Sequence, residues 1–446
     1  MQRLFGTNGV RGITNEDMSP ELALRLGKAI GTYFEGNIIV ATDTRTSNEM
    51  LKDAVISGLI STGCNVFDAK IAPSPALQYY VKNSDADAGV IITASHNPPQ
   101  FNGIKVVDSD GAELARRKEE EIEGIYFNEK FRKAAWNEIG KVYDIDILDF
   151  YIEGVLSKVD VDKIKEHHFK IVVDCGNGAG CYTMPYLLAE MADVITLNAQ
   201  PDGNFPGRNP EPIPDNVGDL IKMVKEIHAD IGIAYDGDAD RAIFVDERGD
   251  YIYGDKTLAA VSGYMVERKK GVVVTPVSTS SCVEEYVERY GGKVVYTKVG
   301  APIVARKMME LNATFGGEEN GGLIFPEHQY CRDGGMASVV ILELMASKNK
   351  KLSEIISDVP SYHLVKTKVK CENKEEVMEK LLKKIDAERI DTTDGIKAYF
   401  KDGWVLIRPS GTEPIIRIYA ESKKEEVAKE IADKYGKMVK MEVGRA

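Results

Sequence analysis

Three aspartates stand at alternate positions in one short segment of the chain, Asp236-Gly-Asp-Ala-Asp-Arg241. Carboxylates spaced in this way in a loop can converge on one hard cation such as Mg²⁺, which prefers oxygen ligands. The spacing also resembles an EF-hand, but Arg241 stands where its tight turn needs Gly, and residues 231–235 and 242–245 have the pattern of strands rather than helices. A solvated acidic turn is the remaining alternative. The sequence favours a Mg²⁺ site at the end of a strand.

A second polar loop, Thr93-Ala-Ser-His-Asn-Pro98, follows an apolar run and places Ser95 on a turn. Ser95 could be a hydrolase nucleophile, but the chain has no G-x-S-x-G motif. Neighbouring residues on an extended loop tend to point apart, so His96 is a poor candidate for its base. Ser95 could equally cap the next helix. Beside a divalent cation, however, a serine suits phosphoryl transfer, because cations neutralise charge on the transferring oxygens.

A third segment, Arg408-Pro-Ser-Gly-Thr-Glu-Pro414, is followed by Arg417. Hydroxyl groups, backbone N–H groups and two guanidinium forks suit a phosphate group. The alternative is a surface turn in which an arginine pairs with Glu413. The nucleotide-binding motif G-x-x-x-x-G-K-[ST] does not occur in the chain.

One glycine-rich segment, Gly176-Asn-Gly-Ala-Gly180, looks like a dinucleotide-binding turn. Its third glycine comes one position too early for G-x-G-x-x-G, and Cys181 takes the expected place. A tight turn between a strand and a helix explains these glycines without a cofactor.

These loops follow strands in a repeated unit of alternating strands and helices. The strands are expected near 38–41, 66–71 and 89–92 in the first unit, 170–173, 194–197 and 231–235 in the second, and 272–275, 293–298 and 313–315 in the third. Such alternation predicts largely parallel sheets, whose ligands bind at the carboxyl ends of the strands. The sequence therefore predicts three similar α/β domains with mixed, largely parallel sheets around a central cleft.

The remainder of the chain has another pattern. Two alternating strands flank Asp402-Gly403, as in a hairpin, and a charged helix closes the chain, which predicts a smaller C-terminal α+β domain. Four domains are expected. Residues 1–145 contain the serine loop (93–98), and residues 146–248 contain the acidic loop (236–241). Residues 249–360 contain a further loop at 316–322, called the third polar loop below, and residues 361–446 contain the phosphate loop (408–414).

Composition excludes several classes of protein. The 446 residues include 57 Lys and Arg and 70 Asp and Glu, a formal net charge of −13, which argues against a nucleic-acid or membrane-surface binder. No CxxC pair occurs among the six cysteines, and the start of the chain lacks the apolar core of a signal peptide. We expect a cytoplasmic protein; monomer and homodimer both stay open.

Together the loops resemble the α-D-phosphohexomutase superfamily along essentially the whole chain. The matching segments, in family order, are Phe5-Gly-Thr-Asn-Gly-Val-Arg-Gly12, Thr93–Pro98 with Asn102-Gly-Ile-Lys105, Asp236–Arg241, Gly317-Glu-Glu-Asn-Gly321 and Arg408–Pro414. One such motif would be a weak signal, whereas five in order are highly specific.

The resemblance implies a role for each matching residue. Ser95 would be the phosphoserine, and Asp236, Asp238 and Asp240 would bind Mg²⁺ together with its phosphate. Arg11, Lys105 and Arg241 would line the phosphoryl-transfer site. Glu318 and Asn320 would bind sugar hydroxyls, with Lys298 near the substrate. The phosphate that does not react would be bound by Arg408, Ser410, Gly411, Thr412 and Arg417.

The implied activity interconverts hexose 6-phosphate and hexose 1-phosphate through phosphoserine and a 1,6-bisphosphate, which also acts as primer. The third loop ends Asn320-Gly321-Gly322 where many members have Ser-Gly-His, so Lys105, Arg11 or His328 would have to take that histidine's role. This variant favours phosphoglucosamine mutase, with phosphomannomutase/phosphoglucomutase as the alternative. An NAD-dependent or nucleotide-sugar oxidoreductase and a non-catalytic sugar-phosphate sensor are remote alternatives.

Overall fold

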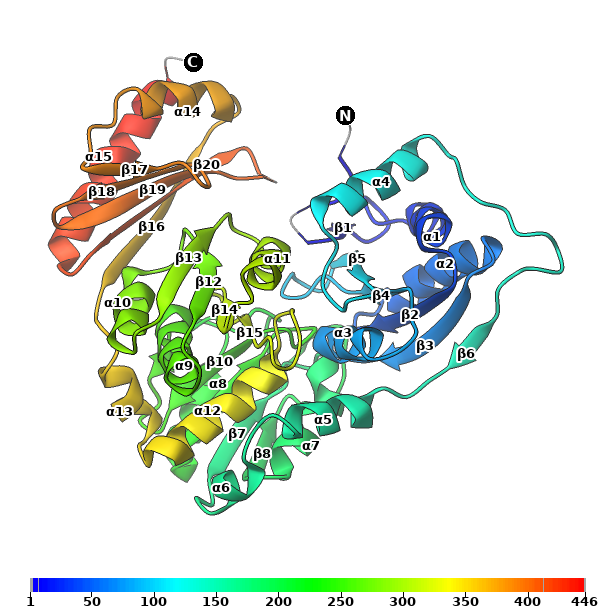
Figure 1. Ribbon diagram of the computed structural model, residues 1–446, viewed down its shortest axis with the longest axis horizontal. Coiled ribbons are helices and arrows are strands. Elements are labelled where there is room, and N and C mark those ends of the chain that lie inside the picture. Colours follow the sequence, from blue (N-terminus) through cyan, green and yellow to red (C-terminus); the bar gives the residue numbers. More distant parts are fainter. Residues whose placement is uncertain (1–2, 7, 412, 445–446) are drawn as a thin grey trace.

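The computed structural model describes residues 3–6, 8–411 and 413–444. Four sheets of six, five, four and five strands follow one another along the chain, and each is formed by one stretch of sequence (Figure 1). The prediction of three α/β domains and a C-terminal α+β domain is confirmed. The residue limits assigned to these domains from the sequence remain predictions.

Domain I is built on a mixed sheet in the order β1-β5-β4-β2-β3-β6. Its elements are β1 (Val10–Ile13), α1 (Pro20–Phe34), β2 (Asn37–Thr42), α2 (Asn48–Ser61), β3 (Asn65–Ile71), α3 (Ser74–Lys82), β4 (Ala88–Ile92), β5 (Phe101–Asp108), α4 (Arg116–Phe127) and β6 (Val142–Asp144). Strand β2 is parallel to β3 and β4, whereas β5 is antiparallel to β4 and β1. Every residue of β4 is buried, because a central strand covered on both faces needs a continuous apolar run.

Domain II has the sheet order β11-β10-β9-β7-β8. Its elements are α5 (Leu148–Leu156), α6 (Val161–Lys165), β7 (Lys170–Asp174), a 3₁₀ turn (Ala179–Tyr182), α7 (Met184–Ala189), β8 (Asp193–Leu197), α8 (Gly218–Ile227), β9 (Ile231–Tyr235), β10 (Ala242–Asp246) and β11 (Tyr251–Ile252). The acidic loop joins β9 to β10, which pair antiparallel. These flanking strands exclude an EF-hand, which requires helices.

Domain III has a four-stranded sheet in the order β13-β12-β14-β15. Its elements are α9 (Gly254–Arg268), β12 (Val272–Pro276), α10 (Ser281–Arg289), β13 (Lys293–Thr297), α11 (Ala301–Leu311), β14 (Phe315–Gly317), β15 (Leu323–Ile324), α12 (Gly334–Lys348) and α13 (Leu352–Ser357). Strand β14 begins two residues later than expected, because Phe315 and Gly316 are the residues that pair with β12. Helix α12 is buried from Gly334 to Ala346 and contacts α5, α7, α9 and β10, so domains II and III share one core.

Domain IV is an entirely antiparallel sheet in the order β16-β20-β19-β18-β17, covered by two helices. Its elements are β16 (His363–Lys370), α14 (Lys374–Leu382), β17 (Arg389–Asp391), β18 (Ile396–Phe400), β19 (Gly403–Pro409), β20 (Ile415–Ser422) and α15 (Glu425–Val443). The hairpin expected at Asp402-Gly403 joins β18 to β19. Figure 1 shows this domain beside domain III and away from the sheet of domain I.

The junction between domains III and IV contains a buried lysine. Lys397 is 2% exposed, its Nζ donates to Val277 O at 2.7 Å, and it lies 4.0 Å from the ring centroid of Trp404. Burial lowers its pKa to about 8. A charged lysine therefore opposes the packing of this junction at neutral pH.

Within the described residues, no helix combines the length and the apolar character needed to cross a membrane.

The Lys397→Met variant should remove a pH-dependent part of the stability. The pKa of this lysine is about 8 in the folded protein and near 10.5 when unfolded, so the unfolded chain binds more protons between these values. Stability of the wild type should therefore rise with pH across this window, by up to roughly 3 kcal/mol relative to the variant. Melting temperatures of both proteins from pH 7 to pH 11 measure this. A difference that does not change with pH would contradict the prediction.

Candidate active site

The acidic loop brings its three carboxylates together. Asp236, Asp238 and Asp240 are buried, and each offers an oxygen within 4.8 Å of the others. Oδ1 of Asp238 and Oδ1 of Asp240 are buried without a hydrogen-bond partner among the described residues. Burial and the neighbouring aspartates raise the pKa of Asp236 to about 8. Unpaired carboxylate oxygens that repel one another fit a hard divalent cation, which would supply the missing partner and the missing charge.

Ser95 of domain I lies against this loop of domain II. Its side chain is buried, and Oγ donates a hydrogen bond to Asp236 Oδ2 at 2.7 Å. The backbone of Ser95 has φ of +52°, a left-handed conformation that costs a residue with a Cβ about 1–2 kcal/mol. The turn therefore needs support from its surroundings.

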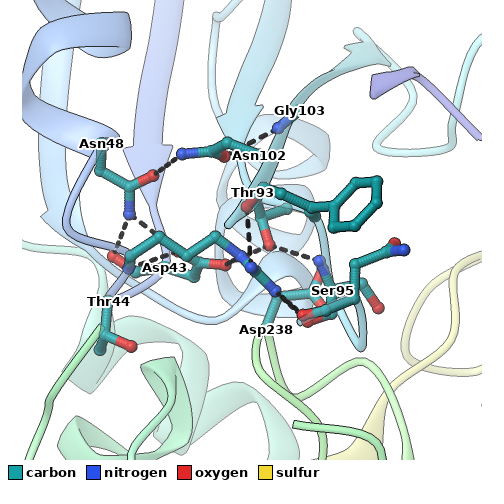
Figure 2. Close-up of polar contacts among 12 residues, drawn as sticks. Asp43, Thr44, Asn48, Thr93, Ser95, Asn102, Gly103 and Asp238 are labelled. Carbon is teal, nitrogen blue, oxygen red and sulfur yellow. Dashed lines mark hydrogen bonds and ion pairs between the residues drawn. The ribbon is translucent and has the colours of Figure 1, made fainter. Parts of the chain in front are cut away.

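A network behind the turn supplies that support (Figure 2). Thr93 Oγ1 accepts from Ser95 N at 2.9 Å and donates to Asp43 Oδ2 at 2.5 Å. Asp43 also accepts from the amide of Asn48, at 2.8 Å, and Asn48 in turn binds Asn102. The network connects the serine turn to the end of β2, to the start of β5 and to the start of α2.

Arg45 is the centre of this support, and no role was predicted for it. Its guanidinium donates to four backbone carbonyls, those of Ser95, Asn97, Pro98 and Phe101, and Nε donates to Asp43 at 3.0 Å. Arg45 is 2% exposed. The signal in the sequence was an Asp and an Arg directly after an apolar strand, a position where a buried ion pair needs a structural reason.

His96 lies closer to the serine than expected. Its Nδ1 is 3.5 Å from Ser95 Oγ, although we expected the two side chains to point apart. Burial and the nearby Arg241 and Arg11 lower the pKa of His96 to about 2. The ring is therefore neutral at physiological pH, and a contact of this length is at most a weak hydrogen bond.

The structure brings three predicted cations to the same place. Lys105 Nζ lies 2.6 Å from Asp238 Oδ2 and 3.3 Å from Asp240 Oδ2. Burial opposes its charge, but these aspartates raise its pKa. Arg11, on the strand next to β5, donates to Asn97 Oδ1 at 2.9 Å. Arg241 Nε lies 3.7 Å from Asp240 Oδ1.

The third polar loop reaches this cluster through a residue that sequence reasoning missed. Glu318 is 5% exposed, and its Oε2 accepts from Arg332 Nη1 at 3.2 Å and from Asn320 Nδ2 at 3.4 Å. Arg332 also donates to Asp240 Oδ2 at 2.5 Å. No sequence motif marks Arg332, which lies ten residues after Gly322. Ser74, also missed, donates to Asp238 Oδ2 at 2.5 Å.

The phosphate loop of domain IV is not joined to this cluster. Arg408 and Arg417 are directly opposite each other on β19 and β20, with Ser410 buried and Gly411 exposed in the turn; Thr412 lies outside the described residues. Arg408 pairs with Asp394, and Arg417 with Glu413. Among the described residues, no hydrogen bond or ion pair links this loop to Ser95 or to the acidic loop.

Arg408 and Arg417 thus present two guanidinium groups at one cross-strand position, each balanced by its own carboxylate. Lys298 is exposed and lines a cavity of about 470 Å³ between domains I and III. Its neighbour Val299 donates through N to Asp394, the partner of Arg408. This contact links the residue after Lys298 to the ion pair of Arg408 with Asp394.

Two other candidates have structural roles. A Cβ at Gly178 would lie 2.5 Å from Gly237 O, and Ala179 N donates to that carbonyl at 2.9 Å, so the glycine-rich turn supports the acidic loop and leaves no room there for a dinucleotide. His328 is buried, stacks on Tyr79 and lies 3.4 Å from Asp333. Its ring therefore contacts the core rather than the third polar loop.

Three α/β domains and an α+β domain, with a buried serine beside three aspartates, form the architecture of an α-D-phosphohexomutase. Family models for phosphoglucomutase/phosphomannomutase match all four domains: alpha/beta/alpha domains I, II and III at residues 2–133, 149–249 and 253–362, and the C-terminal domain at residues 365–435. The chain therefore belongs to the phosphoglucomutase/phosphomannomutase family and is a phosphohexomutase.

Individual relatives agree with this assignment. A phosphoglucomutase/phosphomannomutase of Thermococcus kodakarensis is 49% identical over 441 residues, covering 96% of this chain and 97% of the relative. A phosphoglucosamine/phosphogalactosamine mutase of Sulfurisphaera tokodaii is 44% identical over 452 residues, covering 98% and 99%. The crystal structure of a phosphoglucomutase/phosphomannomutase family protein from Burkholderia thailandensis has a TM-score of 0.89 at 26% identity, covering 98% and 97%.

The Arg45→Lys variant should be strongly destabilised. Lysine keeps the charge beside Asp43 but cannot donate to four carbonyls, so several buried acceptors lose their partners at a cost of about 3 kcal/mol or more. Thermal melting followed by circular dichroism measures the loss. The Arg117→Lys variant is the control, because that side chain is 89% exposed and should change stability by less than about 0.5 kcal/mol. Equal melting temperatures for the two variants would refute this account of Arg45.

Mg²⁺ should stabilise the wild type but not the Asp238→Asn variant. A cation that binds only the folded state adds about 2.7 kcal/mol at 100 times its dissociation constant. Asparagine keeps the shape of Asp238 and removes one charged ligand. Melting temperatures with EDTA and with increasing MgCl₂ measure the difference. Asp250→Asn, a change of an aspartate that is 64% exposed in the same domain, should keep the full response; an undiminished response in Asp238→Asn would place the cation elsewhere.

Proposed function

We propose that this phosphohexomutase transfers a phosphoryl group between Ser95 and the 1- and 6-oxygens of a hexose phosphate. The observation that carries the proposal is the hydrogen bond of 2.7 Å between Ser95 Oγ and Asp236, inside a buried cluster of carboxylates and cations. A solvated serine that merely capped a helix would have no reason to lie in such a cluster.

In the first half of the reaction, the bond between phosphorus and Ser95 Oγ breaks and a bond to a sugar hydroxyl oxygen forms. The sugar hydroxyl loses its proton and the released Ser95 Oγ gains one, so the products are a hexose 1,6-bisphosphate and a serine with a free hydroxyl. In the second half, the other phosphate of the bisphosphate returns to Ser95. Free hexose 1,6-bisphosphate would prime an enzyme molecule whose serine carries no phosphate.

The site residues divide this work. Asp236, Asp238 and Asp240 would hold Mg²⁺, which offsets negative charge on the transferring oxygens. Arg11 and Arg241 would orient the phosphoryl group. Lys105, held between Asp238 and Asp240, would stabilise the same charge, because these aspartates raise its pKa and keep it protonated.

The sugar and its second phosphate would be bound outside this cluster. Glu318 and Asn320 offer acceptors and a donor to sugar hydroxyls. Arg408, Ser410, Gly411, Thr412 and Arg417 would bind the phosphate that does not react, with Lys298 nearby. The facing arginines on β19 and β20 support this assignment, because both guanidinium groups could donate to one phosphate dianion.

Phosphoglucosamine mutase is the activity that we favour. Relatives at 41–44% identity, named 'phosphoglucosamine/phosphogalactosamine mutase' or 'probable phosphoglucosamine mutase', match nearly the whole chain. The alternative is a bifunctional phosphomannomutase/phosphoglucomutase, favoured by the relative at 49% identity. The cytoplasmic location expected from the sequence remains a prediction, and so does a choice between monomer and homodimer.

The Ser95→Ala variant should lose mutase activity by at least ~10⁴-fold, because the group that carries the phosphoryl is gone. The assay uses Mg²⁺ and glucose 1,6-bisphosphate as primer, with glucosamine, glucose and mannose 1-phosphates compared as substrates. Intact mass should show one phosphate on the wild type and none on the variant. Ser109→Ala, a change of an exposed serine in the same domain, should keep full activity. Full turnover by Ser95→Ala, or a wild type inactive on all three sugars, would overturn the proposal.

A further inference from the structure

One buried arginine joins two loops to which the proposed function gives different tasks. Arg332 lies between β15 and α12 and is 5% exposed. Its Nη2 is 2.5 Å from Asp240 Oδ2 in the acidic loop of domain II. Its Nη1 is 3.2 Å from Glu318 Oε2 in the third polar loop of domain III, which would bind the sugar. One guanidinium thus contacts a carboxylate that would hold the cation and a carboxylate that would hold the sugar.

The two loops are already adjacent through their backbones. Ala242 N donates to Gly321 O at 3.2 Å, and Gly334 N donates to Ala239 O at 3.3 Å. These bonds hold the acidic loop beside the third polar loop and the start of α12. Asp240 also contacts Lys105 at 3.3 Å, and Glu318 accepts from Gly300 N at 3.2 Å, but neither of these contacts joins the two carboxylates. A planar guanidinium with two separate donors fixes both side chains at once, which a lysine ammonium cannot do.

The third polar loop contains a glycine, Gly322, whose missing Cβ leaves room for the side chain of Arg332. A Cβ on Gly322 would lie 2.2 Å from Cδ and 2.9 Å from Cγ of Arg332, distances that real Cβ atoms do not adopt. The backbone of Gly322 does not have the positive φ that would itself call for glycine, whereas Gly321 has φ of +90°. Gly322 is therefore a glycine because the stem of Arg332 passes over it.

We propose that Arg332 is a positioning residue that fixes the carboxylate of Glu318, which would bind the sugar, relative to Asp240 of the acidic loop. The proposal rests on the proposed function for the role of Glu318. It also accounts for the loop ending Gly321-Gly322 where many members have a histidine, because any side chain at position 322 would displace the arginine.

Two variants disturb the bridge in different ways. Arg332→Lys replaces the two separate donor nitrogens of the fork with a single ammonium nitrogen, and Gly322→Ala pushes the intact arginine aside. Each should lower kcat/KM by ~10- to 100-fold, mainly through kcat, because misplacing a bound sugar weakens the approach to the phosphoryl group. A residue with only a structural role would lower the melting temperature without this split between kcat and KM. Gly436→Ala is the control, since a Cβ there meets nothing within 4 Å.

A double-variant cycle tests the geometry without relying on activity. Gly322→Ala should lower the melting temperature in the wild type by a few degrees, but should have no further effect in an Arg332→Ala background, where the stem that it strikes is absent. The same cycle in kcat/KM should be non-additive in the same sense. Additive effects in the cycle, or wild-type kcat for both Arg332→Lys and Gly322→Ala, would overturn the proposal.

The failure of the proposed function would look different. A wild-type protein without mutase activity on any of the three sugar phosphates would refute that function and the sugar-positioning role that depends on it. The melting cycle would still decide whether Gly322 is kept small by Arg332. A wild type that is active, with variants that are as active, would refute the role of Arg332 alone.

Discussion

The contact between Ser95 and Asp236 is the constraint on which the site depends, because the two residues belong to different domains. Domain I carries the serine on a strained turn, and domain II carries the aspartates on a loop between two strands. The loops meet closely: a Cβ at Gly237 would lie 2.6 Å from Ser95 O, and Ser74 N donates to Asp238 O at 3.0 Å. Any shift between the domains would therefore separate the serine from the three aspartates.

Charge explains why so many ionised groups can be buried at this junction. Four carboxylates, Asp236, Asp238, Asp240 and Glu318, face four cations, Arg11, Lys105, Arg241 and Arg332, so these eight residues are formally neutral. A phosphoserine dianion and a divalent cation would add charges that cancel. The net charge of −13 for the whole chain consequently says nothing about this site. Local pairing, which sequence totals do not contain, decides what it can bind.

The sequence could predict the loops whose function follows from residue type and spacing. Alternate aspartates after an apolar strand indicated the acidic loop, and the strand itself follows from a buried apolar run. Arg45 and Arg332 could not be predicted, since each acts through contacts with residues distant in sequence. The glycines at 176–180 were attributed to a tight turn, and the neighbour that this turn supports, the backbone of Gly237, became visible only in the structure.

The position of domain IV decides how the second phosphate can be held. Its loop contacts domain III through Asp394, which binds both Arg408 and the backbone of Val299. On the proposed function, a phosphate bound by Arg408 would compete with Asp394 and so weaken one of the contacts between domains III and IV. Other contacts, such as those of Lys397 with Val277 and of Trp404 with Ser281, would remain. If either phosphate of the sugar visits this loop in turn, a junction that loosens in part while it stays joined elsewhere suits the reaction.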